Sequence, residues 1–124
     1  MFKIDSNKYI HITRGDTATF DVEALNKDGS NYTFKANDVV RLNVFKRKDC
    51  NCIEIQKDFV VKQDTEKVQI ELTKDDTKIG DVINKPVSYW YEIELNPNTS
   101  PQTIIGYDID GEKIFRLYPE GGHE

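Results

Sequence analysis

The chain has 124 residues and a formal net charge of −5, with 22 acidic and 17 basic side chains. A chain of this length buries enough surface for one hydrophobic core, so we expect a single domain that spans residues 1–124. The acidic balance argues against a nucleic-acid partner, because phosphate backbones are bound by excess positive charge. The sequence has no run of about 20 apolar residues and no secretory signal at its start. It therefore predicts a protein that is made in the cytoplasm and has no membrane partner.

Apolar and polar residues alternate in many short segments, which is typical of strands that bury one face. Turn segments rich in Gly, Asn and Asp separate these runs. In chain order the predicted strands cover residues 9–13, 17–24, 32–34, 40–44, 52–61, 68–73, 87–95, 103–109 and 113–118. This spacing predicts an all-β fold, an immunoglobulin-like antiparallel β-sandwich of about eight or nine short strands.

Three turn segments refine the prediction. Residues 26–31, which include Gly29, are expected to form a hairpin loop. Asp110-Gly111 separates the last two predicted strands, and this dipeptide favours a tight hairpin, so these two strands are expected to pair. Thr73 is expected to accept a hydrogen bond from the backbone N–H of Asp76, as the N-cap of at most one helical turn.

The turn at 73–77 precedes a tyrosine-rich strand. Immunoglobulin-like domains place a tyrosine at a similar corner, where its ring caps the core and its hydroxyl bonds upstream backbone. This comparison makes Tyr89 the candidate for the corner tyrosine.

The cysteines and acidic residues do not form a complete metal site in the sequence. Cys50 and Cys52 would lie side by side on one strand face, so both are predicted to be reduced. Segment 108–112 resembles a fragment of a calcium loop but offers too few ligands, and the cysteine pair lacks the further ligands that zinc requires. We expect no metal and no cofactor.

The sequence offers no catalytic motif, and we expect that the protein is not an enzyme. Catalysis requires a base, acid or nucleophile within reach of a partner that orients it. His11 is expected to be a solvent-side strand residue without such a partner. Arg14-Gly15-Asp16 matches a tripeptide that integrins recognise, but we interpret it as a turn between two strands.

Strand 87–95 carries the candidate interface. If Tyr89 and Tyr91 point into the core, then Ser88, Trp90 and Glu92 point to the opposite face. A large ring among polar neighbours often marks a contact surface. The alternative is that a loop or the chain's own tail covers Trp90. The interface candidates are Trp90, Ser88 and Glu92.

Segments 10–17, 27–30, 72–77 and 89–95 together resemble the N-terminal domain family of phage baseplate upper proteins. The resemblance implies a β-sandwich in a tail or baseplate of phages and prophages of Gram-positive bacteria, without catalytic residues. The expected function is a non-catalytic virion structural module that binds other virion proteins or itself and is assembled into the virion tail. The alternative is a carbohydrate-binding β-sandwich module in which Trp90 and nearby tyrosines stack on sugar rings.

Overall fold

The computed structural model describes residues 1–46, 52–108 and 111–120. Across these ranges the chain forms nine strands and no helix, which confirms the all-β prediction. No helix in this part of the chain has the length and apolar character to cross a membrane. The strands are β1 (Phe2–Ile4), β2 (Ile10–Thr13), β3 (Ala18–Val22), β4 (Val39–Phe45), β5 (Ile53–Val60), β6 (Val68–Leu72), β7 (Val87–Leu95), β8 (Gln102–Ile105) and β9 (Lys113–Tyr118).

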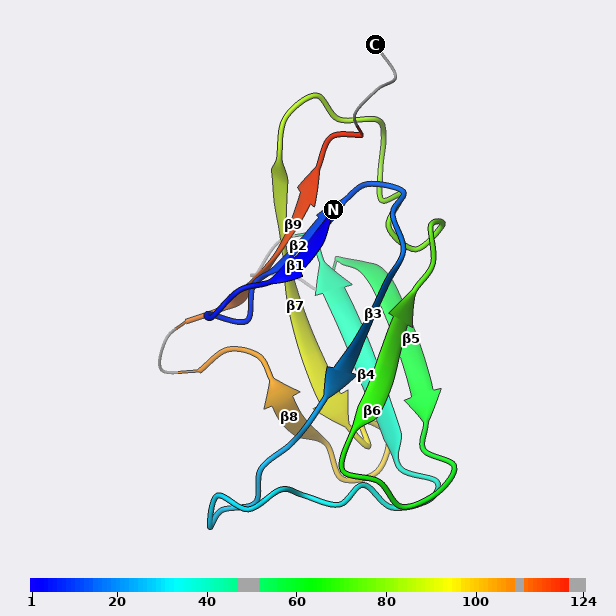
Figure 1. The fold of residues 1–124 in the computed structure, drawn as a ribbon, viewed down its shortest axis with the longest axis vertical. Coiled ribbons are helices and arrows are strands. Elements are labelled where there is room, and N and C mark those ends of the chain that lie inside the picture. The colour runs from blue at the N-terminus through cyan, green and yellow to red at the C-terminus, as the bar shows by residue number, and fades with distance from the viewer. Residues whose placement is uncertain (47–51, 109–110, 121–124) are drawn as a thin grey trace.

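The strands form two sheets that pack as a sandwich. Sheet A has the order β1-β2-β9-β7-β4-β5, with β8 also paired to β7, and sheet B consists of β3 and β6. In Figure 1, β3 and β6 cross in front of the strands of sheet A. Neighbouring strands are antiparallel except β2 and β9, which are parallel. The β-sandwich is thus confirmed, while its membership of the immunoglobulin-like group stays a prediction.

The core lies between the two sheets and follows the alternation of the sequence. Every second residue of β6 is buried, and the same period holds along β7. The largest fully buried side chains are Phe34, Phe115, Ile10, Ile12, Leu42, Ile70, Leu72, Ile93, Leu117, Val22, Val40 and Val44. Each buried aliphatic or aromatic side chain contributes about 1.5 to 3 kcal/mol, so this layer supplies most of the driving force for folding.

The predicted pairing of the last two strands is wrong. β9 pairs with the first half of β7, at Val87–Tyr91, and β8 pairs with its second half, at Ile93–Leu95. Because β4 occupies the other side of β7, β8 and β9 are successive parts of one interrupted strand beside β7. Asp108 and Gly111 do form a local bridge, so the turn exists. A turn dipeptide does not determine whether its flanking strands pair with each other.

Two further strand predictions differ from the structure. β1 was not predicted, because three residues are too few to show a period. Residues 32–34 form no strand, and only Phe34 makes an isolated bridge, to Thr65. The hairpin loop at 26–31 is confirmed by the antiparallel bridge between Leu25 and Asn31, with Gly29 at a φ of 88°.

The turn after β6 has the predicted cap. The Thr73 hydroxyl accepts the backbone N–H of Asp76 at 3.2 Å, and the Asp76 carboxylate accepts the backbone N–H of Thr73 at 2.8 Å. The Thr77 N–H donates to the Thr73 carbonyl at 3.3 Å, which closes a single turn. Reciprocal capping therefore fixes the chain where it leaves β6.

The prediction that Cys52 is a reduced thiol is wrong, since Cys52 is disulfide-bonded. It lies just before β5 and not within it, so the strand geometry on which the prediction rested does not apply. Cys50 lies outside the described residues.

Candidate functional site

Strand β7 places the three predicted interface residues on one surface. Tyr89 and Tyr91 are buried in the core, with 8% and 4% of their surface exposed. Ser88, Trp90 and Glu92 are partly exposed, at the alternate positions of the strand. They therefore lie on the outer face of sheet A, away from sheet B. The predicted register of this strand is confirmed.

Two residues from other strands flank Trp90. Ile114 on β9 and Phe45 on β4 are its direct cross-strand partners, and both are partly exposed. Directly opposed side chains of neighbouring strands lie about 4.5 to 5.5 Å apart at their Cβ atoms, so the three side chains adjoin. We call Ile114, Trp90 and Phe45 the apolar stripe. Sequence alternation placed Trp90 on the outer face of its strand, but the strand order that brings Ile114 and Phe45 beside it was not predictable.

Polar and charged residues border the apolar stripe. Arg116 on β9 lies opposite Ser88, and Asn43 on β4 lies opposite Glu92. Asn43 is 4% exposed and donates a hydrogen bond to Glu94 at 3.0 Å. Burial and the neighbouring Glu94 raise the pKa of Glu92 above its ordinary value. An apolar centre with a polar border is the usual composition of a protein contact surface.

The indole nitrogen of Trp90 is a buried hydrogen-bond donor. Nε1 is inaccessible to solvent and makes no hydrogen bond with the described residues. The side chain as a whole is partly exposed, so the chain covers one edge of the ring and leaves other parts accessible. An unpaired buried donor costs about 1 to 3 kcal/mol.

His11 has two polar partners, which corrects the prediction that it has none. Its Nδ1 lies 2.8 Å from the Tyr118 hydroxyl, and its Nε2 lies 2.9 Å from the Asp5 carboxylate. The hydrogen bond from His11 lowers the pKa of Asp5, with help from the backbone N–H groups of Tyr9 and Asn7. Tyr118 is 107 residues away from His11 in the sequence, so no local pattern indicated this contact.

The hydrogen bond to upstream backbone that was expected of the Tyr89 hydroxyl is made by the Tyr91 hydroxyl instead. The Tyr91 hydroxyl donates to the backbone carbonyl of Lys8, in the turn between β1 and β2. Burial and the nearby Asp5 raise the pKa of Tyr91. Tyr89 caps the core as predicted, but its hydroxyl has no hydrogen-bond partner among the described residues.

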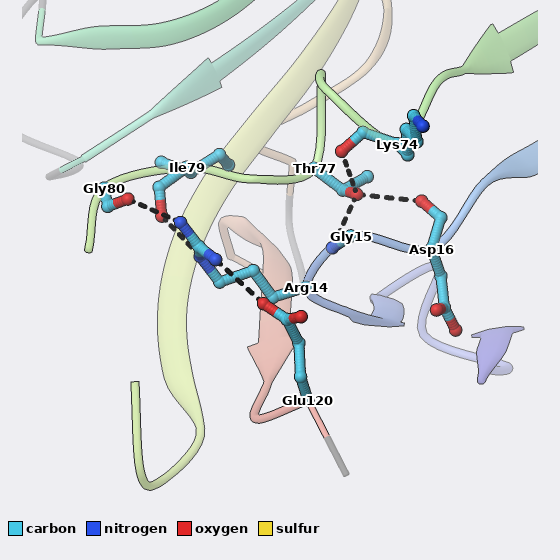
Figure 2. A network of polar contacts seen from close by, with 8 residues as sticks. All are labelled: Arg14, Gly15, Asp16, Lys74, Thr77, Ile79, Gly80 and Glu120. Carbon is cyan, nitrogen blue, oxygen red and sulfur yellow. Dashed lines mark hydrogen bonds and ion pairs between the residues drawn. The ribbon is translucent and has the colours of Figure 1, made fainter. Parts of the chain in front are cut away.

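Arg14 is the centre of a polar network that joins distant segments (Figure 2). The side chain donates to the carbonyls of Ile79 at 3.3 Å and Gly80 at 2.7 Å, and it forms an ion pair with Glu120 at 2.8 Å. Arg14 is only 9% exposed, so its guanidinium is not displayed to a partner. The Arg14-Gly15-Asp16 tripeptide therefore forms a turn with a structural role, as predicted from the sequence.

Thr77 contacts the backbone of the same turn through its hydroxyl. Its hydroxyl accepts the Gly15 N–H at 3.0 Å and donates to the Asp16 carbonyl at 2.8 Å (Figure 2). Gly15 has a φ of 87°, a left-handed conformation that side chains disfavour. The capped turn after β6 and the β2–β3 turn are thus tied together.

The described residues contain no group of three or more His, Cys, Asp or Glu side chains arranged to hold a metal ion. Asp108 lies in segment 108–112, which resembles a fragment of a calcium loop, and it accepts a hydrogen bond from the Lys113 ammonium at 2.9 Å. Asp110 lies outside the described residues.

The fold and this site define the chain as a β-sandwich with a mixed apolar and charged face on its larger sheet. No family model, no curated protein and no solved structure matches the chain.

Proposed function

We propose that this chain is a non-catalytic structural module of a phage or prophage tail or baseplate, which binds other virion proteins or itself through the outer face of sheet A. The observation that carries the proposal is the apolar stripe, with Trp90 at its centre and Ser88, Arg116 and Glu92 at its border. Tryptophan and arginine are enriched among the residues that dominate binding energy at protein interfaces. The resemblance to baseplate upper proteins supports the viral setting.

The carbohydrate-binding alternative receives less support from this face. Stacking on successive sugar rings needs several exposed aromatic rings in a row. On the apolar stripe the other members are Ile114 and Phe45, and Phe45 is only partly exposed. Tyr107 is the most exposed aromatic side chain of the described residues, at 80%, and it lies outside the strands.

The proposal is tested by co-expression with each product of the genes that flank this one, followed by size-exclusion chromatography. We expect one tail protein to co-elute with the chain and Trp90→Ala to abolish co-elution. Thr19→Ala is the matched control, because Thr19 is exposed on β3 in the other sheet. Flanking genes without tail or lysis functions would overturn the viral setting. Glycan binding that depends on Trp90, without any protein partner, would favour the alternative.

A further inference from the structure

The outer face of sheet A carries opposite charges on the two sides of the apolar stripe. On one side, Lys3 of β1 and Arg116 of β9 lie in the same row across the sheet, with His11 between them. On the other side, Glu92 and Glu94 of β7 follow Trp90 at alternate positions. The stripe thus separates a basic row, which runs across β9, β2 and β1, from two acidic residues that follow each other along β7.

Several of these charges have no ion-pair partner among the residues that the structure describes. Arg116 is partly exposed, and it makes no side-chain hydrogen bond or ion pair with any described residue. Glu92 likewise has no ion-pair partner there, and its pKa is raised by burial and by Glu94. A half-buried carboxylate without a cation is stabilised when a cation is brought to it.

Two other charged groups on this face are already engaged. Asp5, beside the basic row, is bound to His11 at 2.9 Å. Arg41, beside Glu94, forms an ion pair with Asp58 at 2.6 Å. The contrast that remains is therefore Lys3 and Arg116 against Glu92, because Glu94 accepts a hydrogen bond from Asn43 and lies opposite Arg41.

We propose that two copies of this chain pack face to face through sheet A, about a two-fold axis that runs along the apolar stripe. This rotation places stripe on stripe and keeps each strand over its own counterpart. The Arg116 end of the basic row therefore approaches Glu92 of the other copy, whereas Lys3, three strands from β7, does not. The same patch is used twice, as in other isologous dimers. The inference rests on the proposed function, because it names a second copy as the partner of the same face.

The spacing of the sheet makes the charge contacts reachable. Alternate residues of a strand are about 7 Å apart, so the rows on either side of Trp90 are equally distant from the axis. Ser88 of one copy then faces Glu92 of the other, and Arg116 is one strand away, at about 5 Å. The long arginine side chain spans that offset and pairs with the carboxylate in planar geometry.

The test uses charge reversal with the full chain, in sedimentation velocity across a concentration series. We expect the parent chain to dimerise. Arg116→Glu and Glu92→Arg should each weaken dimerisation at least about tenfold, because like charges then meet twice. Mixing the two variants should restore a dimer that contains one copy of each, because every charge contact is again attractive. The double variant should also recover.

Glu71→Arg is the matched control, since Glu71 is exposed on β6 in the other sheet. It should dimerise like the parent chain, and circular dichroism should show that every variant is folded. A parent chain that stays monomeric, or single variants that do not recover on mixing, would overturn the two-fold dimer. Such a result leaves the proposed function standing if a tail protein still co-elutes through Trp90.

Discussion

Arg14 and Glu120 are 106 residues apart in the sequence, yet their side chains meet at 2.8 Å. Arg14 comes from the turn after β2, and Glu120 follows β9. Because β2 and β9 are parallel neighbours, their C-terminal ends lie side by side at the same end of sheet A. The ion pair therefore reports on the tertiary arrangement, because it forms only when the first and last parts of the chain are both in place.

Arg14→Ala is expected to lower the free energy of unfolding by about 3 kcal/mol, because it leaves two carbonyls and a carboxylate without their donor. Denaturant unfolding measures this value. Lys35→Ala is the control: Lys35 is 3.8 Å from Asp64 and both side chains are more than half exposed. Its loss should cost no more than about 1 kcal/mol. Equal effects of the two substitutions would show that the Arg14 network adds nothing to stability.

Tyr91→Phe is expected to lower the free energy of unfolding by about 1 to 1.5 kcal/mol, since it removes the hydrogen bond from the buried Tyr91 side chain to the backbone carbonyl of Lys8. Tyr89→Phe should be close to neutral, because the Tyr89 hydroxyl has no hydrogen-bond partner among the described residues. Thermal melts of both variants make the comparison. A larger loss of stability in Tyr89→Phe than in Tyr91→Phe would show that Tyr89 makes the hydrogen bond expected of a corner tyrosine.

The difference between Tyr89 and Tyr91 illustrates what the sequence could predict. Alternation determines which side chains share a face, so the burial of Tyr89 and the outer position of Trp90 followed from the local pattern. The partner of a hydroxyl depends on which distant segment passes by. Lys8 reaches Tyr91 only because β2 pairs with β9 and β9 with β7.

The outer face of sheet A shows the same limit of prediction from local sequence. Trp90, Ser88 and Glu92 were predictable from one strand, whereas Phe45, Ile114 and Arg116 joined them through the order of strands in sheet A. The local turn at Asp110-Gly111 misled the prediction of that order. Its flanking strands both pair with β7, a choice made by tertiary packing and not by the turn.

Glu92→Gln is expected to raise the free energy of unfolding of the monomer at pH 7. Burial and Glu94 raise the pKa of Glu92, so the fold favours its protonated form. In the parent chain this group therefore adds stability as the pH falls from neutral through the raised pKa, down to the unfolded value of about 4.3. Glutamine removes that dependence.

The measurement is denaturant unfolding at pH 7 and at pH 5, at a concentration where sedimentation shows monomer. Both values lie above the range where Asp58, whose pKa is lowered by the hydrogen bond from Arg41, loses its contribution on protonation. The gap between Glu92→Gln and the parent chain should narrow at pH 5. A gap that widens at pH 5, or a Glu92→Gln variant that is less stable than the parent chain at pH 7, would contradict the raised pKa of Glu92.

Tyr89 and Trp90 are neighbours in the sequence with opposite expected roles. Tyr89→Ala should lower the free energy of unfolding by about 3 to 5 kcal/mol, since it truncates a buried aromatic ring in a domain held by about 5 to 15 kcal/mol in total. Trp90→Ala should cost only about 1 kcal/mol, because the ring is partly exposed on the outer face and its N–H has no hydrogen-bond partner among the described residues. Trp90→Phe distinguishes the effect of ring packing from that of the unpaired indole N–H. It keeps an aromatic ring but removes the buried N–H, which costs stability. The melting temperature of this variant should therefore equal or exceed that of the parent chain. A collapse of Trp90→Ala beside a parent-like melt of Tyr89→Ala would place the strand in the opposite register, and the apolar stripe would then belong to the core.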